Sequence, residues 1–228
     1  MNTKLDDVKN FWNLESCGER YTSDVDKFEF YKQQSTLRYE LEPYIKDFAE
    51  FKKFKDFDVL EIGVGMGSDH FLIAENKPKS LTGIDLTERA ISHTKDRFDL
   101  FNFKSLLKTD NAEKLSFEDK SFDKVYSWGV LHHSPNTKKC FEEVWRVLRP
   151  NGIAKIMVYH KYSLVGLMLW TRYGLLKMNP FISISSIYSK YLESPGTKAY
   201  SIKEIKKILK EYKIIECKVQ LSFSDLLE

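Results

Sequence analysis

The segment DVLEIGVGMGSDH, residues 58–70, has the residue types and spacing of a ligand site. Three glycines, Gly63, Gly65 and Gly67, alternate with other residues directly after an apolar run, and Glu61 stands two places before the first of them. Glycines so placed let a backbone approach a ligand closely. The ligand could be a dinucleotide, a nucleotide phosphate or a molecule that is not a phosphate.

Two details of this glycine loop argue against a phosphate. The sixth position of a GxGxxG fingerprint, counted from Gly63, is Ser68, and no GK[ST] sequence marks a P-loop. The carboxylate of Glu61 would repel a pyrophosphate, whereas it would help to hold an ammonium or sulfonium group, directly or through water. The loop therefore favours a cationic nucleoside.

The elements that must position this loop alternate between strands and helices. We expect strands at residues 57–62, 80–85, 105–109, 122–128 and 153–159, and helices at residues 69–76, 88–101 and 137–148. Such alternation implies a parallel sheet that is covered on both faces. The predicted fold class is α/β, with a Rossmann-like, doubly wound and mostly parallel sheet.

Ligands of such sheets bind where the carboxyl ends of the strands meet. Asp85 ends the second expected strand, where a carboxylate can accept hydrogen bonds from both hydroxyls of a ribose; a turn residue before a helix is the alternative. Asp110 either accepts from the amino group of an adenine or belongs, with Asn111, to an ordinary turn. Other polar and aromatic residues follow the fourth and fifth strands: Ser127, Trp128, His132, His133, Tyr159, His160 and Lys161.

Four segments, VLEIGVGMG, TGIDLT, DNAEKLSFEDKSFDKVYSWGVLHH and FEEVWRVLRPNG, in this order and spacing, resemble the class I S-adenosylmethionine-dependent methyltransferases of the methyltransferase type 11 family. The resemblance covers residues 55–160. It implies a sheet of about seven strands and S-adenosyl-L-methionine as the cofactor. It also implies cofactor-binding roles for Glu61, Gly63, Gly65 and Gly67 at the methionine part, Asp85 with Leu86 at the ribose, Asp110, Asn111 and Ala112 at the adenine, and Ser127 and Trp128 beneath the sulfonium.

The reaction that this resemblance implies is in-line transfer of a methyl group to a small-molecule acceptor. A sulfonium methyl is already activated, so the protein mainly aligns the acceptor and, for an oxygen or nitrogen acceptor, removes a proton. The candidate bases are His132, His133 and His160, because histidine titrates near the working pH; one histidine of the HH pair could instead pack or cap the backbone. Candidate acceptor-binding residues are Tyr21, Tyr39, Tyr159 and Lys161. No metal cluster is expected.

The 228 residues suit a single domain. We expect an N-terminal helical cap at residues 1–50, the cofactor-binding core at 55–160, a lid insert at 162–191, and a last helix and strand at 201–223. The apolar stripe of the insert either packs or contacts an acceptor, and in the second case the acceptor has an apolar portion or the insert rests on a lipid surface. The family adds one further strand to the sheet, and nothing after Phe223 supplies it. Either the sheet is a strand short, another segment or a second subunit of a homodimer fills the place, or the chain is truncated.

Composition excludes several classes of partner. The 36 Lys and Arg residues and the 33 Asp and Glu residues are interspersed, which argues against a nucleic-acid partner. The polar start is not a signal peptide, no segment is apolar enough to span a bilayer, and three scattered cysteines fit a reducing cytoplasm. Two other functions stay open: a non-catalytic S-adenosylmethionine-binding regulatory protein, and a nicotinamide-dependent oxidoreductase, which the missing third glycine disfavours.

Overall fold

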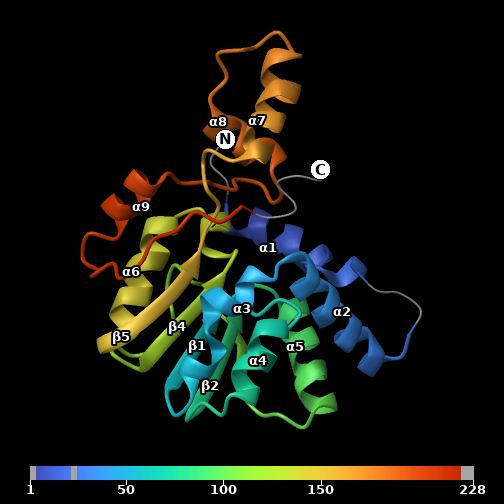
Figure 1. Cartoon of the computed structure of the whole chain (residues 1–228), viewed down its shortest axis with the longest axis vertical. Helices are drawn as coiled ribbons and strands as arrows, with labels where there is room; N and C mark the ends of the chain where they lie inside the picture. The colour runs from blue at the N-terminus through green and yellow to red at the C-terminus, as the bar shows by residue number, and fades with distance from the viewer. Residues whose placement is uncertain (1–3, 22–24, 222–228) are drawn as a thin grey trace.

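A computed structural model describes residues 4–21 and 25–221. This part of the chain forms one sheet of five parallel strands in the order β3-β2-β1-β4-β5 (Figure 1). Its strands are β1 (Asp58–Ile62), β2 (Ser80–Asp85), β3 (Leu106–Thr109), β4 (Phe122–Trp128) and β5 (Leu148–Met157). The expected α/β fold is confirmed, and the strand order reverses beside β1, where the glycine loop leaves the sheet.

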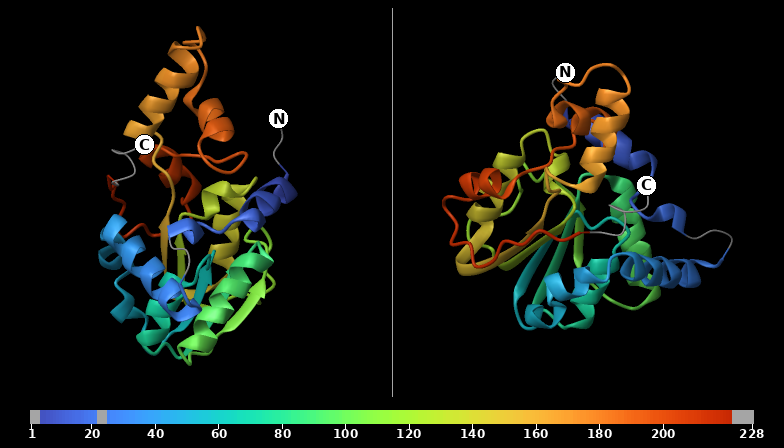
Figure 2. Two further views of the ribbon diagram at one scale, coloured as in Figure 1. Left: turned by 90° about the vertical axis from the view of Figure 1, so that its right-hand side faces the viewer. Right: turned by 45° about the horizontal axis from the view of Figure 1, so that its top comes forward.

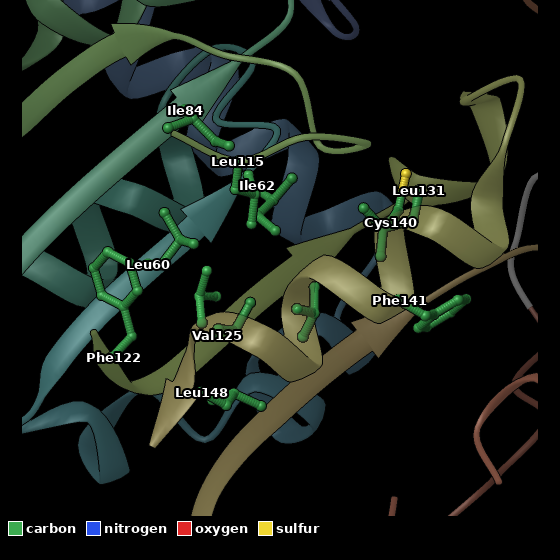
Figure 3. Packing of buried hydrophobic residues seen from close by; sticks show 12 residues of the cluster. Leu60, Ile62, Ile84, Leu115, Phe122, Val125, Leu131, Cys140, Phe141 and Leu148 are labelled. Carbon is green, nitrogen blue, oxygen red and sulfur yellow. The ribbon is translucent and has the colours of Figure 1, made fainter. Parts of the chain in front are cut away.

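Helices cover both faces of the sheet, and alternate side chains of β1 pack against the helices on opposite faces. Val59 of β1 packs in the apolar cluster under α3 (Tyr44–Ala49), α4 (Ser68–Glu75) and α5 (Glu88–Leu100). Leu60 and Ile62 point to the other face and pack with α6 (Thr137–Val147), as Figure 3 shows. Because side chains alternate along a strand, a buried parallel strand must be apolar on both sides.

The N-terminal region folds as helices beside this core. They are α1 (Leu5–Leu14), the 3-10 turn η1 (Glu19–Tyr21), α2 (Lys27–Leu41), α3 and the 3-10 turn η2 (Phe51–Phe54). The side chain of Asp26 caps α2 by accepting from the backbone of Phe28 and Glu29. Helix α2 contacts α3, α4 and α5, and α1 contacts α5, so the segment lies against the helices that follow β1 and β2.

A helical hairpin leaves the sheet after β5 and stands clear of the core (Figures 1 and 2). It consists of α7 (Leu164–Trp170), a π-helical turn η4 (Thr171–Leu175) and α8 (Ile184–Tyr191). Its own small apolar cluster, which includes Leu169, Ile187 and Tyr188, holds the two arms together. After it comes α9 (Ile202–Ile208), the expected last helix, which Ser201 and Glu204 cap by a capping box.

The end of the chain differs from expectation. A strand was predicted at residues 214–223, but residues 214–221 form none, and residues 222 and 223 lie outside the described part. The segment is exposed, with Ile215 at 78% and Leu221 at 60% of full exposure. Strand-forming residues need a partner strand to satisfy their backbone groups, and here none pairs with them. The described sheet therefore has five strands rather than the seven that the resemblance implied, and a homodimer stays a prediction.

Candidate active site

The glycine loop lies at the carboxyl end of β1 and borders a large cavity. All three glycines have positive φ, with Gly63 at +86°. A Cβ atom added to Gly63 would stand 2.1 Å from a methyl carbon of Val130, whereas one added to Gly65 would meet nothing within 4 Å. Gly63 is thus required by close packing, and Gly65 presents bare backbone to the cavity.

Asp85 stands at the end of β2, beside this loop, and lines the same cavity. Its carboxylate accepts from the backbone N–H of Gly65 at 3.2 Å, and from the N–H and hydroxyl of Thr87 at 3.0 and 2.9 Å. Burial raises the pKa of Asp85, and these hydrogen bonds oppose that shift. Asp85 therefore ties the start of α5 to the glycine loop at the strand switch point, where a ribose is expected.

The loop after β3 brings Asp110, Asn111 and Ala112 to the cavity wall. Asp110 accepts from the backbone of Asn111 and from the N–H and hydroxyl of Ser116, and Asn111 accepts from the N–H of Glu113. These bonds shape the loop itself, as turn chemistry does. The expected adenine contact is not tested by them and stays a prediction.

Glu61 is buried in β1 and contacts His70, which was not among the predicted site residues. Its carboxyl lies 2.8 Å from Nδ1 of His70, whose Nε2 lies 3.0 Å from the hydroxyl of Ser105. Burial raises the pKa of Glu61 well above its usual range and lowers the pKa of His70 to about 3. Both shifts disfavour the charged forms of the two groups, and the tautomer of His70 sets which partner donates in each contact.

A second polar cluster lies between α2 and α4. Asp69, 4% exposed, accepts from the guanidinium of Arg38 at 3.0 Å, from the hydroxyl of Tyr39 at 2.7 Å and from the hydroxyl of Tyr126 at 2.9 Å. Burial lowers the pKa of Arg38, but the charge and hydrogen bond of Asp69, together with the charge of Glu42, outweigh it and raise that pKa. Arg38 and Asp69 both line the cavity, so this cluster locks the N-terminal helices onto the glycine loop.

Ser127 and Trp128 end β4 as predicted, with different surroundings. The hydroxyl of Ser127, fully buried, donates to the carbonyl of Ile62 at 3.0 Å and ties β4 to β1. The ring of Trp128 lies on the cavity wall and packs 5.2 Å from the ring of Phe48 and 5.9 Å from that of Tyr44. The N-terminal segment thus closes one side of the site.

The two histidines after β4 differ sharply. His133 lines the cavity: its Nδ1 lies 2.8 Å from the hydroxyl of Ser194, its Nε2 3.4 Å from Glu193, and its ring 5.2 Å from that of Trp12. His132 is fully buried behind it, and neither ring nitrogen has a hydrogen-bond partner among the described residues. Of these two histidines, only His133 lines the cavity and can contact a molecule there.

Tyr159 and Glu193 complete this wall. The Tyr159 hydroxyl donates to the carboxylate of Glu193, 2.9 Å from each oxygen, and its ring packs 4.0 Å from that of His132. Glu193 lines the cavity from the base of the hairpin and has a φ of +141°, a strained value for a residue with a side chain. The sequence did not single it out, because it is 34 residues from Tyr159.

Three remaining predicted residues stand apart from this wall. His160 lines the cavity, and its Nδ1 donates to the carbonyl of Tyr162. Lys161 forms an ion pair with Glu204 of α9 at 2.8 Å, so its charge stabilises the contact of this segment with α9. Tyr21 ends η1, and its side chain lies outside the described part of the structure.

The unpartnered His132 makes stability depend on pH. Burial, then His133 and Lys198, lower the pKa of His132 well below its ordinary value. Because the pKa of His132 is lower in the folded state than in the unfolded state, the stability of the fold with neutral His132 is fully present above about pH 6.5 and is lost as the pH falls. Below that pH, we expect the free energy of unfolding to fall more steeply in the wild type than in His132→Phe, by about 1.4 kcal/mol per pH unit. Urea unfolding across this range measures both slopes, and parallel slopes would contradict the assignment.

The strand order of the sheet and the helices that cover it match the class I methyltransferase fold. The structure of magnesium protoporphyrin IX methyltransferase from Synechocystis PCC 6803, with bound SAH, superposes with a TM-score of 0.61 at 13% identity, covering 91% of this chain and 88% of that one. A Pyrococcus horikoshii OT3 protein superposes with a TM-score of 0.59 at 22% identity, covering 90% and 89%. These likenesses confirm the fold.

Residues 60–156 match the Methyltransf_11 family model, described as a methyltransferase domain. Phosphoethanolamine N-methyltransferase 2 of Caenorhabditis elegans is 31% identical over 118 residues, which are 51% of this chain and 26% of that protein. Erythromycin 3''-O-methyltransferase of Saccharopolyspora erythraea is 33% identical over 103 residues, 43% and 33% of the two. The chain spans between a quarter and a half of the length of the curated relatives that it matches.

Proposed function

We propose that this chain is an S-adenosyl-L-methionine-dependent methyltransferase that acts on a small-molecule acceptor. The observation that carries the proposal is the juxtaposition of Asp85 with the bare backbone of Gly65, both at the edge of one cavity. The family of residues 60–156 and the related methyltransferases support the same reaction.

The residues at the cavity fit this cofactor. Gly65 gives close backbone approach, Gly63 and Gly67 let the loop pack against Val130 and Thr94, and a carboxylate at Asp85 suits the two hydroxyls of a ribose. Leu86, Ala112 and Trp128 would supply apolar walls for the adenosine and the methyl group, with Asp110 and Asn111 at the adenine and Ser127 fixing β4 beneath. Glu61 would act behind the loop, through His70, rather than as an exposed charge.

When bound, the cofactor supplies an electrophilic methyl group on a sulfonium. The work left to the protein is to align an acceptor and to exclude water. The wall of His133, Tyr159 and Glu193 provides polar atoms for this, because each lies on the cavity and the Glu193 carboxylate can accept a hydrogen bond from an acceptor N–H or O–H. Burial lowers the pKa of His133 to about 3, so it stands as a neutral group that can orient an acceptor by hydrogen bonding but is a weak base.

The cysteines support a cytoplasmic location, which we propose together with this function. Cys17, Cys140 and Cys217 are free thiols in the structure, and free thiols are typical of proteins in a reducing compartment.

Calorimetry with S-adenosylhomocysteine tests the proposal, and Asp85→Ala locates the site. The variant loses charge-assisted hydrogen bonds worth about 1.5–3 kcal/mol each, so affinity should fall at least about tenfold. Asp99→Ala, an exposed acid on α5, serves as the matched control and should bind as the wild type does. Wild-type protein that binds NAD and neither sulfur nucleoside would overturn the proposal. Tight binding without methyl transfer to any acceptor would indicate the regulatory alternative.

A further inference from the structure

The tip of the helical hairpin exposes more apolar side chain than any packing role requires. Residues 175–181 are all exposed, and within them Leu176 is 72%, Met178 90% and Phe181 97% exposed. The views of Figures 1 and 2 agree that the tip stands away from the rest of the molecule. Such a concentration of exposed apolar groups on a projecting element marks an interaction surface.

The residue types at the tip are not explained by local structure. Met178 has a φ of +56°, a conformation that glycine or asparagine adopts at less cost. A large apolar residue here therefore carries two free-energy costs, one from the positive φ of its backbone and one from the exposure of its side chain to water. Pro180 precedes Phe181 and restricts the backbone that presents it.

The charge around the tip has one sign. No Asp or Glu occurs between Glu143 and Glu193, whereas the hairpin carries Arg172, Lys177 and Lys190. All three cations are exposed. Arg172 also borders a shallow apolar depression together with Leu164, Leu167, Met168, Thr171 and Leu176. Apolar side chains with cations beside them and no acids match an anionic lipid surface.

Other occupants fit this surface less well. The side chains that face the cavity come from the other side of the hairpin, such as Val165, Leu169 and Tyr188, so the tip does not cover the cavity. A second copy docked tip to tip would bring the cations of both hairpins together with no acid to neutralise them. No helix of the described residues is long and apolar enough to cross a bilayer, so the contact would be made at the surface.

We propose that the hairpin docks the protein on anionic membrane surfaces. Leu176, Met178 and Phe181 enter the boundary between headgroups and acyl chains, while Arg172 and Lys177 meet the lipid phosphates. This docking is independent of methyl transfer. If the proposed function also holds, docking brings the base of the hairpin, and with it the Glu193 wall of the cavity, close to the membrane, where an amphiphilic acceptor would be found.

Co-sedimentation of the full chain with vesicles, without cofactor, tests the docking. We expect binding to phosphatidylcholine vesicles that contain phosphatidylglycerol, weaker binding to phosphatidylcholine alone, and loss of the difference at high salt. Met178→Asn/Phe181→Ser should reduce the partition coefficient at least about tenfold, since both side chains enter the membrane. Leu106→Thr, an exposed leucine on β3, is the matched control and should bind as the wild type does.

The charge contribution is tested separately. Arg172→Gln/Lys177→Gln should weaken binding to the anionic vesicles and flatten its salt dependence, whereas Lys206→Gln/Lys207→Gln on α9 should not. Wild-type protein that stays in the supernatant, or tip variants that bind vesicles as the wild type does, would overturn the proposal. So would a wild-type dimer in sedimentation that the Met178→Asn/Phe181→Ser change dissociates, since the tip would then join two copies. Calorimetry with S-adenosylhomocysteine on the same samples reports separately on the proposed function.

Discussion

Replacing Asp69 by alanine is expected to lower the free energy of unfolding by about 3–5 kcal/mol. The carboxylate is buried and accepts from Arg38, Tyr39 and Tyr126 at once. Its removal leaves the guanidinium of Arg38, which is largely buried, with the more distant Glu42 at 3.5 Å as its ion-pair partner, beside two hydroxyls that have lost their acceptor. A buried charge that loses its nearest partner and buried hydroxyls without an acceptor are both costly to a fold.

Urea unfolding of three variants separates the charge from the shape. Asp69→Leu/Arg38→Met removes both charges and keeps similar volume, so it should recover much of the stability that Asp69→Ala loses. Asp47→Ala on α3, an exposed acid, should change the free energy of unfolding by less than about 0.5 kcal/mol. An Asp69→Ala protein within about 1 kcal/mol of the wild type would show that the cluster does not hold α2 to α4.

The parts of the fold that depend on local pattern were predictable from the sequence. Strand β4 begins and ends where it was expected, at Phe122 and Trp128, and α5 begins at the expected Glu88, where Thr87 caps it by accepting from the N–H of Ala90. The amphipathic helix α6 begins at Thr137 and ends at Val147, one residue before the predicted end. Periodicity, capping and turn residues each act within a few positions, so a single sequence carries them.

The parts of the site that depend on long-range contacts were not predictable in this way. Glu193 reaches Tyr159 and His133 only because the hairpin folds back on β5, and Arg38 reaches Asp69 across 31 positions. Asp69 follows the glycine loop directly, so the sequence did place it near the site. What the sequence lacked was the partner that gives this carboxylate its role.

Glu61 shows how burial changes a prediction about charge. From the sequence, its carboxylate appeared as a charge that repels phosphate and attracts a sulfonium. In the fold it is 2% exposed and paired with His70, and the neutral forms of both groups are favoured. A formal charge in a sequence becomes a field in the site only if its surroundings keep it ionised. The preference for a cationic nucleoside therefore rests on the family and the backbone geometry.

Replacing Gly63 by alanine should weaken binding of S-adenosylhomocysteine at least about thirtyfold. The added Cβ would lie 2.1 Å from Cγ2 of Val130, and the φ of +86° disfavours any side chain. Overpacking costs about 1–3 kcal/mol, and backbone strain roughly the same. If each cost takes its lower value of about 1 kcal/mol, their sum of about 2 kcal/mol corresponds to a thirtyfold loss of affinity. The strain acts on binding because the loop that must shift is the one that lines the cavity.

A double variant and a neighbouring glycine make this prediction specific to Val130. Gly63→Ala/Val130→Ala removes the methyl groups that clash, so it should bind more tightly than Gly63→Ala, although the φ of residue 63 still prevents full recovery. A Cβ at Gly65 would meet no protein atom within 4 Å but would stand at the cavity, where the cofactor is proposed to approach the backbone. Gly65→Ala should therefore lower affinity too, but should destabilise the fold less than Gly63→Ala does. Calorimetry measures the affinities, and thermal unfolding followed by circular dichroism measures the stabilities. If Gly63→Ala/Val130→Ala binds no more tightly than Gly63→Ala, the contact with Val130 does not shape the cofactor loop.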